Sequence, residues 1–471
     1  MLIFAEYVVK ATKKHVTVSI VCLLLSACAN LTAGNLFSHY SAQNQNLYQT
    51  VKQGQYAEAT DLLEEYVAGD ILDNLEKGRV YFLNQQYAES KATFEFSDAA
   101  IKEQQSKALI SISDTATSVG SLAANDNLND YQPADYELGF LHLYLGLNYV
   151  QANDLDGALV EMRRANQVQE QARANREAEL QNAQNQLREN GVSANLGSVL
   201  AKYPDAGKTL QAVQNGYLLY LSALLYEASN DLNSAYIDYK RALAVAPQNN
   251  AVIDGTLRVA KRLGMKEDLV VLEKQYGVTQ TLQNGQGRVI LLQEQGVVKA
   301  MESWRLSLPL YDSRGRSALY SLALPYYHSG VVQQKFYSQL NGKEISTSTL
   351  VDVDLMAQQN LSEKMPTIAI RQALRVMAKD QLRKETANGN DVGNLVFNIW
   401  NTLTEQPDTR SWITLPASVK GATEIVLSGE QTLSVAGKSY SFNVPDRGTT
   451  LVWVSQQGSN ATVWHKQLGK L

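Results

Sequence analysis

The stretch 145-LGLNYVQANDLDGALVEMRRA-165 decides how the first half of the chain folds. A small residue, Gly146, is followed three positions later by an aromatic residue, Tyr149. A polar turn comes next, and then Ala158 with the bulky apolar Met162 four positions further on. Small residues at these places let two short helices approach each other closely, so the pattern predicts a helical hairpin.

The same rhythm recurs in three more segments. They carry Gly54, Tyr56, Ala59 and Leu63, then Gly78, Tyr81, Tyr87, Ser90 and Phe94, and finally Ala223, Tyr226, Leu232, Ala235, Tyr239, Ala242 and Pro247. This repetition resembles the tetratricopeptide (TPR) pattern, and residues 251–276 read as a fifth, degenerate hairpin. One hairpin cannot bury its apolar face alone. We therefore expect an all-α, TPR-like solenoid over residues 46–277.

A polar stretch with helical character interrupts this pattern at about 166–210. Its apolar residues form only a narrow stripe. One interpretation is a pair of lengthened, solvated helices that protrude from the solenoid, and the other is a coiled-coil arm that docks a partner.

TPR solenoids generally offer a concave groove lined by the first helix of each hairpin. In this sequence six residues fall on that face: Phe140, Leu143, Leu147, Tyr217, Tyr220 and Leu224. An aromatic groove suits an extended peptide or a partner helix. The same residues could equally pack on the next hairpin or on the C-terminal domain, and the sequence leaves both readings open.

From about residue 278 the hydrophobic period changes. Segments such as 287-GRVILLQEQG-296 read as strands, whereas the region around Pro366 has strong helical periodicity. We expect residues 278–471 to form a separate α+β domain with mainly antiparallel strands. The whole chain is thus predicted to be multidomain.

Three cations, Arg371, Arg375 and Lys379, recur every four residues along the predicted helix of this domain. They would lie on one edge of the helix. This edge could bind an anionic glycan or an acidic partner. It could also be a solvated edge that pairs with nearby acids such as Asp352, Asp354 and Glu363.

The N-terminal residues resemble a targeting signal. Three lysines precede a short apolar run, which ends in 25-LSAC-28 and resembles the lipobox of bacterial lipoproteins. That resemblance implies cleavage after a signal peptide of residues 1–27, and a diacylglycerol and an N-acyl chain on Cys28. An aspartate after the lipidated cysteine usually retains a lipoprotein in the inner membrane. Because Ala29 stands there instead, we expect the protein to be anchored in the outer membrane, on its periplasmic side. Residues 28–45 read as a tether.

Composition narrows the functional classes. The chain has 471 residues, net charge −5, five histidines and two cysteines, of which cleavage would remove Cys22. These leave little material for a metal site, and basic residues are not massed as nucleic-acid binding requires. No hydrolase, zinc-protease or nucleotide-binding motif occurs, so we expect neither an enzyme nor a cofactor beyond the lipid.

A wider resemblance rests on the order of the lipobox, the hairpins and several C-terminal motifs. The most specific of these are 324-LPYY-327, 351-VDVDLMAQQNLSEKMPTIAIRQALRVMAK-379 and 408-DTRSWITLP-416. In this order the chain is similar to a family of uncharacterised Gram-negative lipoproteins with TPR repeats. Members are often encoded near LpoB-type activators of penicillin-binding proteins. The resemblance implies a role in envelope or peptidoglycan maintenance.

Two functions follow as hypotheses. The first is a periplasm-facing scaffold or adaptor that binds periplasmic or outer-membrane proteins, with peptidoglycan as a further possible partner. The second is a glycan-binding or glycan-cleaving envelope protein whose site lies in the C-terminal domain, since carboxylate-based sites leave no local motif.

Overall fold

The computed structural model describes residues 39–63, 68–111, 130–189, 193–194, 210–311, 317–328, 336–386 and 407–471. The predicted signal peptide and Cys28 lie outside the described residues. Helix α3 (Tyr40–Gln43) falls within the segment predicted as a tether, and its Tyr40 is buried.

Helical hairpins occupy the first half of the described chain. They pair α4 (Gln45–Lys52) with α5 (Tyr56–Asp61), α6 (Asp70–Leu83) with α7 (Tyr87–Ser111), α9 (Asp135–Gln151) with α10 (Leu155–Glu189), α13 (Gly216–Ala228) with α14 (Leu232–Val245), and α15 (Asn250–Leu263) with α16 (Lys266–Tyr276). A short helix, α12 (Leu210–Val213), precedes α13. The predicted TPR-like helical region is thus present, and its hairpins follow the predicted order.

The small residues of the repeat lie where two helices of a hairpin meet. A Cβ atom added to Gly146 would come within 2.5 Å of the Cε atom of Met162. At Gly78 an added Cβ would come within 2.6 Å of the ring of Phe94. The hairpins therefore close because glycine leaves room for a large side chain of the second helix.

A mixed five-stranded sheet forms the centre of the second half. Its order is β12 (Asn460–Gly469), β11 (Thr449–Gln457), β2 (Gln286–Gln295), β8 (Ser418–Leu427) and β7 (Ser348–Asp352). Strands β11 and β2 pair in parallel, and the other neighbours are antiparallel. This matches the predicted α+β region with mainly antiparallel strands.

A four-stranded sheet covers one face of the central sheet. Its order is β10 (Lys438–Val444), β9 (Gly429–Val435), β5 (Ser338–Leu340) and β6 (Lys343–Glu344). On β2, Val289 and Leu291 pack toward this second sheet, whereas Ile290 and Leu292 join the core of the helical region. Strand alternation thus gives β2 two buried faces, which explains its nearly continuous apolar run.

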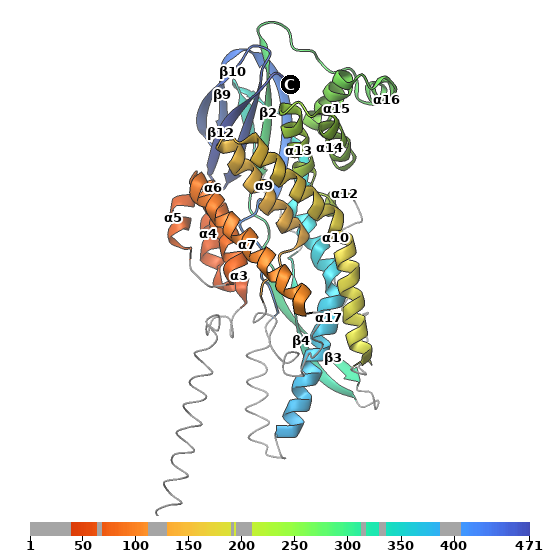
Figure 1. Ribbon diagram of the computed structural model, residues 1–471. Helices are drawn as coiled ribbons and strands as arrows, with labels where there is room; N and C mark the ends of the chain where they lie inside the picture. The colour runs from red at the N-terminus through yellow and green to blue at the C-terminus, as the bar shows by residue number, and fades with distance from the viewer. Residues whose placement is uncertain are drawn as a thin grey trace, which may run out of the picture.

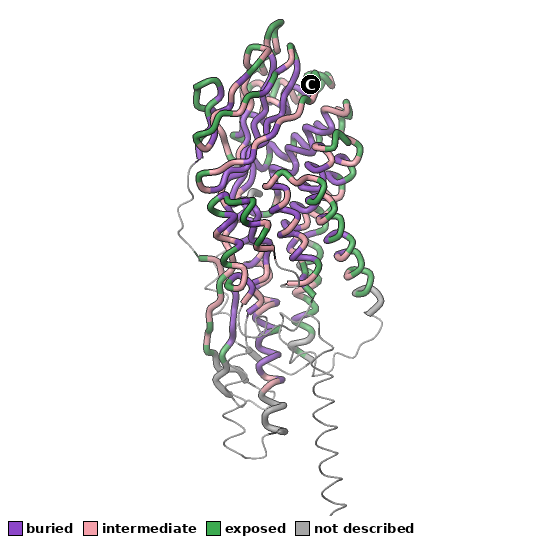
Figure 2. Tube along the Cα trace, turned by 90° about the vertical axis from the view of Figure 1, so that its left-hand side faces the viewer, coloured by how far each residue is buried: buried purple, intermediate pink, exposed green. Residues whose placement is uncertain are grey.

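The helical hairpins cover the other face of the central sheet, so both halves share one core (Figure 1). Figure 2 shows buried residues running without a break from the strands into the hairpins. The two regions predicted as separate domains are therefore packed as one body.

This packing corrects the predicted partner groove. All six residues assigned to it have no exposed surface, namely Phe140, Leu143, Leu147, Tyr217, Tyr220 and Leu224. They belong to the same core cluster as Leu292 and Trp453 of the sheet. The concave side of the hairpins is filled by the chain itself, because an apolar sheet face covers it.

An arm leaves the body at the end opposite the sheets, as Figure 1 shows. It combines α10 with α17 (Val353–Thr386) and the hairpin of β3 (Glu302–Tyr311) and β4 (Ser317–Tyr326). A two-residue strand, β1 (Ser193–Ala194), pairs with β3. On α10, Ala183 packs against Ile370 and Leu374 of α17. Where it is described, the polar insert is mainly the end of one long helix, and its apolar stripe meets a helix of the same chain.

Candidate functional site

Two buried carboxylates of the helical hairpins hold the segment 412–414 by its backbone. On α6, Glu76 accepts hydrogen bonds from the backbone N–H of Ile413 (2.8 Å) and from the N–H and hydroxyl of Thr414 (3.2 and 2.6 Å). Tyr40 donates a further bond of 3.2 Å to it. Burial raises the pKa of Glu76 to about 8, although these donors favour the charged form.

Glu137, near the start of α9, holds the preceding residue of this segment in the same way. It accepts bonds of 2.7 Å from the backbone N–H of Trp412 and of Ala134, and one from the hydroxyl of Tyr131. Burial raises the pKa of Glu137 as well, against these donors. Both carboxylates accept hydrogen bonds from this segment, and Glu137 also lines a cavity beside it.

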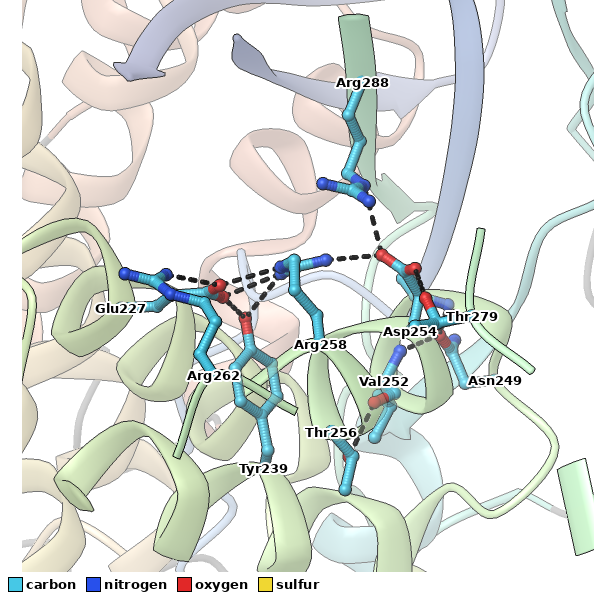
Figure 3. Close-up of polar contacts among 11 residues, drawn as sticks. Glu227, Tyr239, Asn249, Val252, Asp254, Thr256, Arg258, Arg262, Thr279 and Arg288 are labelled. Carbon is cyan, nitrogen blue, oxygen red and sulfur yellow. Dashed lines mark hydrogen bonds and ion pairs between the residues drawn. The ribbon is translucent and has the colours of Figure 1, made fainter. Parts of the chain in front are cut away.

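Ion pairs tie the hairpins to the sheet at the far end of the repeats (Figure 3). Arg258 of α15 contacts Glu227 at 2.7 Å and Asp254, and Arg288 of β2 contacts Asp254 at 3.1 Å. Opposite charges raise the pKa of Arg258 despite its burial. The network joins the last hairpins to the central sheet, and its charges are paired with one another rather than offered to a ligand.

A cavity lies where the body meets the arm. It has a volume of about 210 Å³. Helix α17 contributes Lys364 and Arg371 to its lining, and Tyr131, Tyr136 and Tyr327 line it as well. Since Lys364 and Arg371 are seven residues apart, they lie on one face of the helix, two turns from each other.

Neither of these two cations has a hydrogen bond or ion pair to another described residue. Lys364 is half-buried and its charge acts on Glu137, whereas Arg371 is exposed. A third cation, Arg410, is held by two bonds to Asp408, of 2.9 and 2.8 Å. The cavity therefore offers two cationic groups to a ligand and keeps a third in a structural pair.

The three cations of the predicted basic edge have different surroundings on α17. Arg371 reaches the cavity, but Arg375 is only 4% exposed and belongs to the packed side of the helix. Lys379, nearer the end of the arm, is half-buried and does not line the cavity. The predicted edge is thus not one continuous surface, because α17 is covered by α10 and β4 along part of its length.

Sequence reasoning missed Lys364 and the tyrosines around it. Lys364 lies outside the i, i+4, i+8 series, and Tyr131 and Tyr327 come from loops distant in sequence. In the segment 408–412, Arg410 pairs with Asp408 and Trp412 is fully buried. The place of this segment beside a cavity had no signal in the sequence.

Within the described ranges no group of three potential ligand side chains could hold a metal ion. Across those same residues, no helix is both long and apolar enough to cross a membrane.

Comparison with known proteins assigns the chain to no family. No family model and no curated protein matches the chain. Among solved structures, MamA AMB-1 matches with 14% identity and a TM-score of 0.27, covering 50% of this chain and 88% of its own. The TPR2AB domain of yeast Sti1, in complex with pHSP90, matches with 10% identity and a TM-score of 0.20, covering 50% and 88%.

These TM-scores are too low to support a conclusion about function. The description as a TPR-like helical region joined to a sheet region rests on the hairpins and strands given above.

Proposed function

We propose that the protein is a lipid-anchored adaptor of the cell envelope that faces the periplasm and binds an acidic segment of a partner protein. The observation that carries the proposal is the cavity in which Lys364 and Arg371 face open space without a hydrogen bond or ion pair to another described residue. The lipobox around Cys28 supports the location. The concave groove, which would be the expected partner site of a TPR-like solenoid, is filled and cannot serve.

The chemistry of the cavity favours an acidic ligand along α17. Two cations two helical turns apart match carboxylates that are spaced along an extended chain. The tyrosines of the lining add apolar area with polar tips, as binding surfaces commonly do. Four acidic residues also line the cavity, namely Asp130, Glu137, Glu179 and Asp408, so acidic groups of a ligand are directed to Lys364 and Arg371 of α17.

The proposal is tested by reversing the two charges together, as Lys364→Glu with Arg371→Glu. Lipidated wild-type and variant proteins are crosslinked in envelopes, captured proteins are identified, and binding is remeasured with the purified partner and its acidic segments. We expect the variant to bind at least about tenfold more weakly, and wild-type binding to weaken as salt rises.

A matched control reverses two exposed lysines of α16, as Lys266→Glu with Lys274→Glu, which changes the net charge equally. It should bind as wild type does. Equal binding by both double variants would refute the site. Retention of the protein on peptidoglycan, with no protein partner that depends on Lys364 and Arg371, would refute the adaptor function and support the glycan hypothesis.

A further inference from the structure

A second, smaller cavity adjoins the first. It has a volume of about 30 Å³ and lies among α9, α10, α12, the start of α13 and α17. Tyr136 and Asn360 line both cavities. Because one water needs about 10–15 Å³ on this kind of measure, the space admits about two waters or a group of three non-hydrogen atoms.

Four side-chain amides line the small cavity, namely Gln169, Asn215, Gln359 and Asn360, and the first three are each fixed by a bond at one end. The Oε1 atom of Gln169 accepts from the backbone N–H of Asn215 at 2.7 Å, and the Oδ1 atom of Asn215 accepts from the N–H of Leu218 at 3.1 Å. The Nε2 atom of Gln359 donates to Glu363 at 2.8 Å. Turning any of these amides over would bring two donors or two acceptors together, so their orientations are set.

Among the described residues, the other end of each of these three amides has no partner. The Nε2 atom of Gln169, the Nδ2 atom of Asn215 and the Oε1 atom of Gln359 are buried without a hydrogen bond among the described residues. Asn215 and Gln359 are 1% and 5% exposed. Buried polar groups in native proteins are almost always paired, so three orphans around one small space indicate an occupant.

Two donors and one acceptor complement a carboxamide. Its oxygen can accept from Gln169 and Asn215, and its N–H can donate to Gln359. A carboxylate would have no hydrogen for Gln359, and the carboxyl groups of Asp135 and Glu363 in the same wall would repel it. The small cavity thus prefers a neutral amide, although the larger cavity prefers an acid.

We propose that the two cavities form one site for a peptide segment in which a glutamine or asparagine side chain enters the small cavity while a nearby carboxylate meets Lys364 and Arg371. This inference rests on the proposed function, whose ligand it makes more specific. Gln169, Asn215 and Gln359 then determine specificity, and Lys364 and Arg371 supply most of the affinity.

The test uses fluorescein-labelled, end-blocked heptapeptides of glutamate and glycine. One glutamine is placed in turn at each position, and each peptide is compared with its glutamate twin. Binding to the full lipidated chain in detergent is measured by fluorescence anisotropy. We expect at least one glutamine peptide to bind about tenfold more tightly than its twin.

The key variant is Asn215→Asp, which keeps the Oδ1 acceptor for Leu218 but replaces the orphan donor with an acceptor. It should abolish the preference for glutamine, so that no glutamine peptide binds more tightly than its glutamate twin. Gln169→Glu likewise replaces an unpaired donor with an acceptor, and it is the variant to test if Asn215→Asp does not fold. Asn233→Asp, at an exposed position of α14, is the matched control and should keep the preference.

The outcomes separate the two proposals. If no acidic peptide binds, or if the Lys364→Glu and Arg371→Glu variant binds them as wild type does, the adaptor site itself is wrong and this inference falls with it. If acidic peptides bind and need the two cations, but glutamine and glutamate twins bind equally, the small cavity holds water only. That result overturns this inference and leaves the proposed function standing.

Discussion

Arg79 of α6 and Glu294 of β2 form an ion pair in which neither side chain has exposed surface. The Nη2 atom of Arg79 lies 2.5 Å from the Oε2 atom of Glu294, and the two residues are 215 positions apart in the chain. The guanidinium also lies 4.5 Å from the centre of the Tyr144 ring, and the Tyr144 hydroxyl donates to Glu294. This pair fixes how the helical repeats sit on the sheet.

Removing one member of this pair should destabilise the protein strongly. Arg79→Met leaves Glu294 charged and buried, and we expect the free energy of unfolding to fall by about 3–5 kcal/mol. The double variant Arg79→Met with Glu294→Gln should lose less, because the buried charge is gone. Urea unfolding followed by circular dichroism measures both. A loss under about 1 kcal/mol for Arg79→Met would show that the pair is not buried in solution.

The stability of the protein should depend on pH through Glu76. Its pKa is about 8 in the folded state and near 4.5 in the unfolded chain, so between these values the folded state binds more protons. The contribution of Glu76 is therefore fully present below pH 4.5 and is lost as pH rises through about 8. Glu76→Gln should flatten this fall in the free energy of unfolding, measured at about pH 5, 6.5 and 8.

Glu137 titrates in the same direction, so the slope in Glu76→Gln should shrink without vanishing. Glu58→Gln, at an exposed position of α5, should leave the slope unchanged. If Glu76→Gln and Glu58→Gln give the same slope as wild type, Glu76 is ionised in the folded protein over this whole range.

The filled groove makes its own prediction. Phe140 has no exposed surface, so Phe140→Ala should lower the free energy of unfolding by about 3–5 kcal/mol through a cavity between helix and sheet. Val160, which is 46% exposed on α10, should tolerate alanine within about 0.5 kcal/mol. A thermal or urea series compares them. Similar, small losses for both would mean that the groove is open and available to a partner.

Lipidation is tested at Cys28. Cys28→Ser cannot form the thioether, so this variant should lose palmitate labelling and leave the outer-membrane fraction. Labelling and fractionation of whole cells measure both effects. Normal labelling and normal fractionation of Cys28→Ser would show that the 25-LSAC-28 stretch is not a lipobox.

Some of this architecture was readable in single segments. The hairpin built on Gly146 and Met162 is a local pattern, and its spacing predicted the helices and their contact. The continuous apolar run of β2 likewise predicted a buried strand. These features depend on residues close in sequence, which share one element or one turn.

Local sequence patterns did not predict that the partner groove is filled. Tyr217 has the character of a partner-binding residue, and nothing in its sequence neighbourhood predicts its contact with Trp453. The Nε1 atom of Trp453 donates to the hydroxyl of Tyr217 at 3.0 Å, across 236 positions of chain. The hydrophobic effect is not directional, so an apolar face is stabilised equally well by a segment of the same chain and by a partner protein.

By itself the sequence determined the repeat of helical hairpins and the change to strands, because both depend on local spacing and period. The lipobox resemblance is also a local pattern, and lipidation stays a prediction. Tertiary structure alone decided that the hairpins close on the sheet, that Arg375 is packed while Arg371 is free to line a cavity, and that Lys364 joins it. The reason is physical: a site formed by loops and helices distant in sequence exists only after the shared core has brought them together.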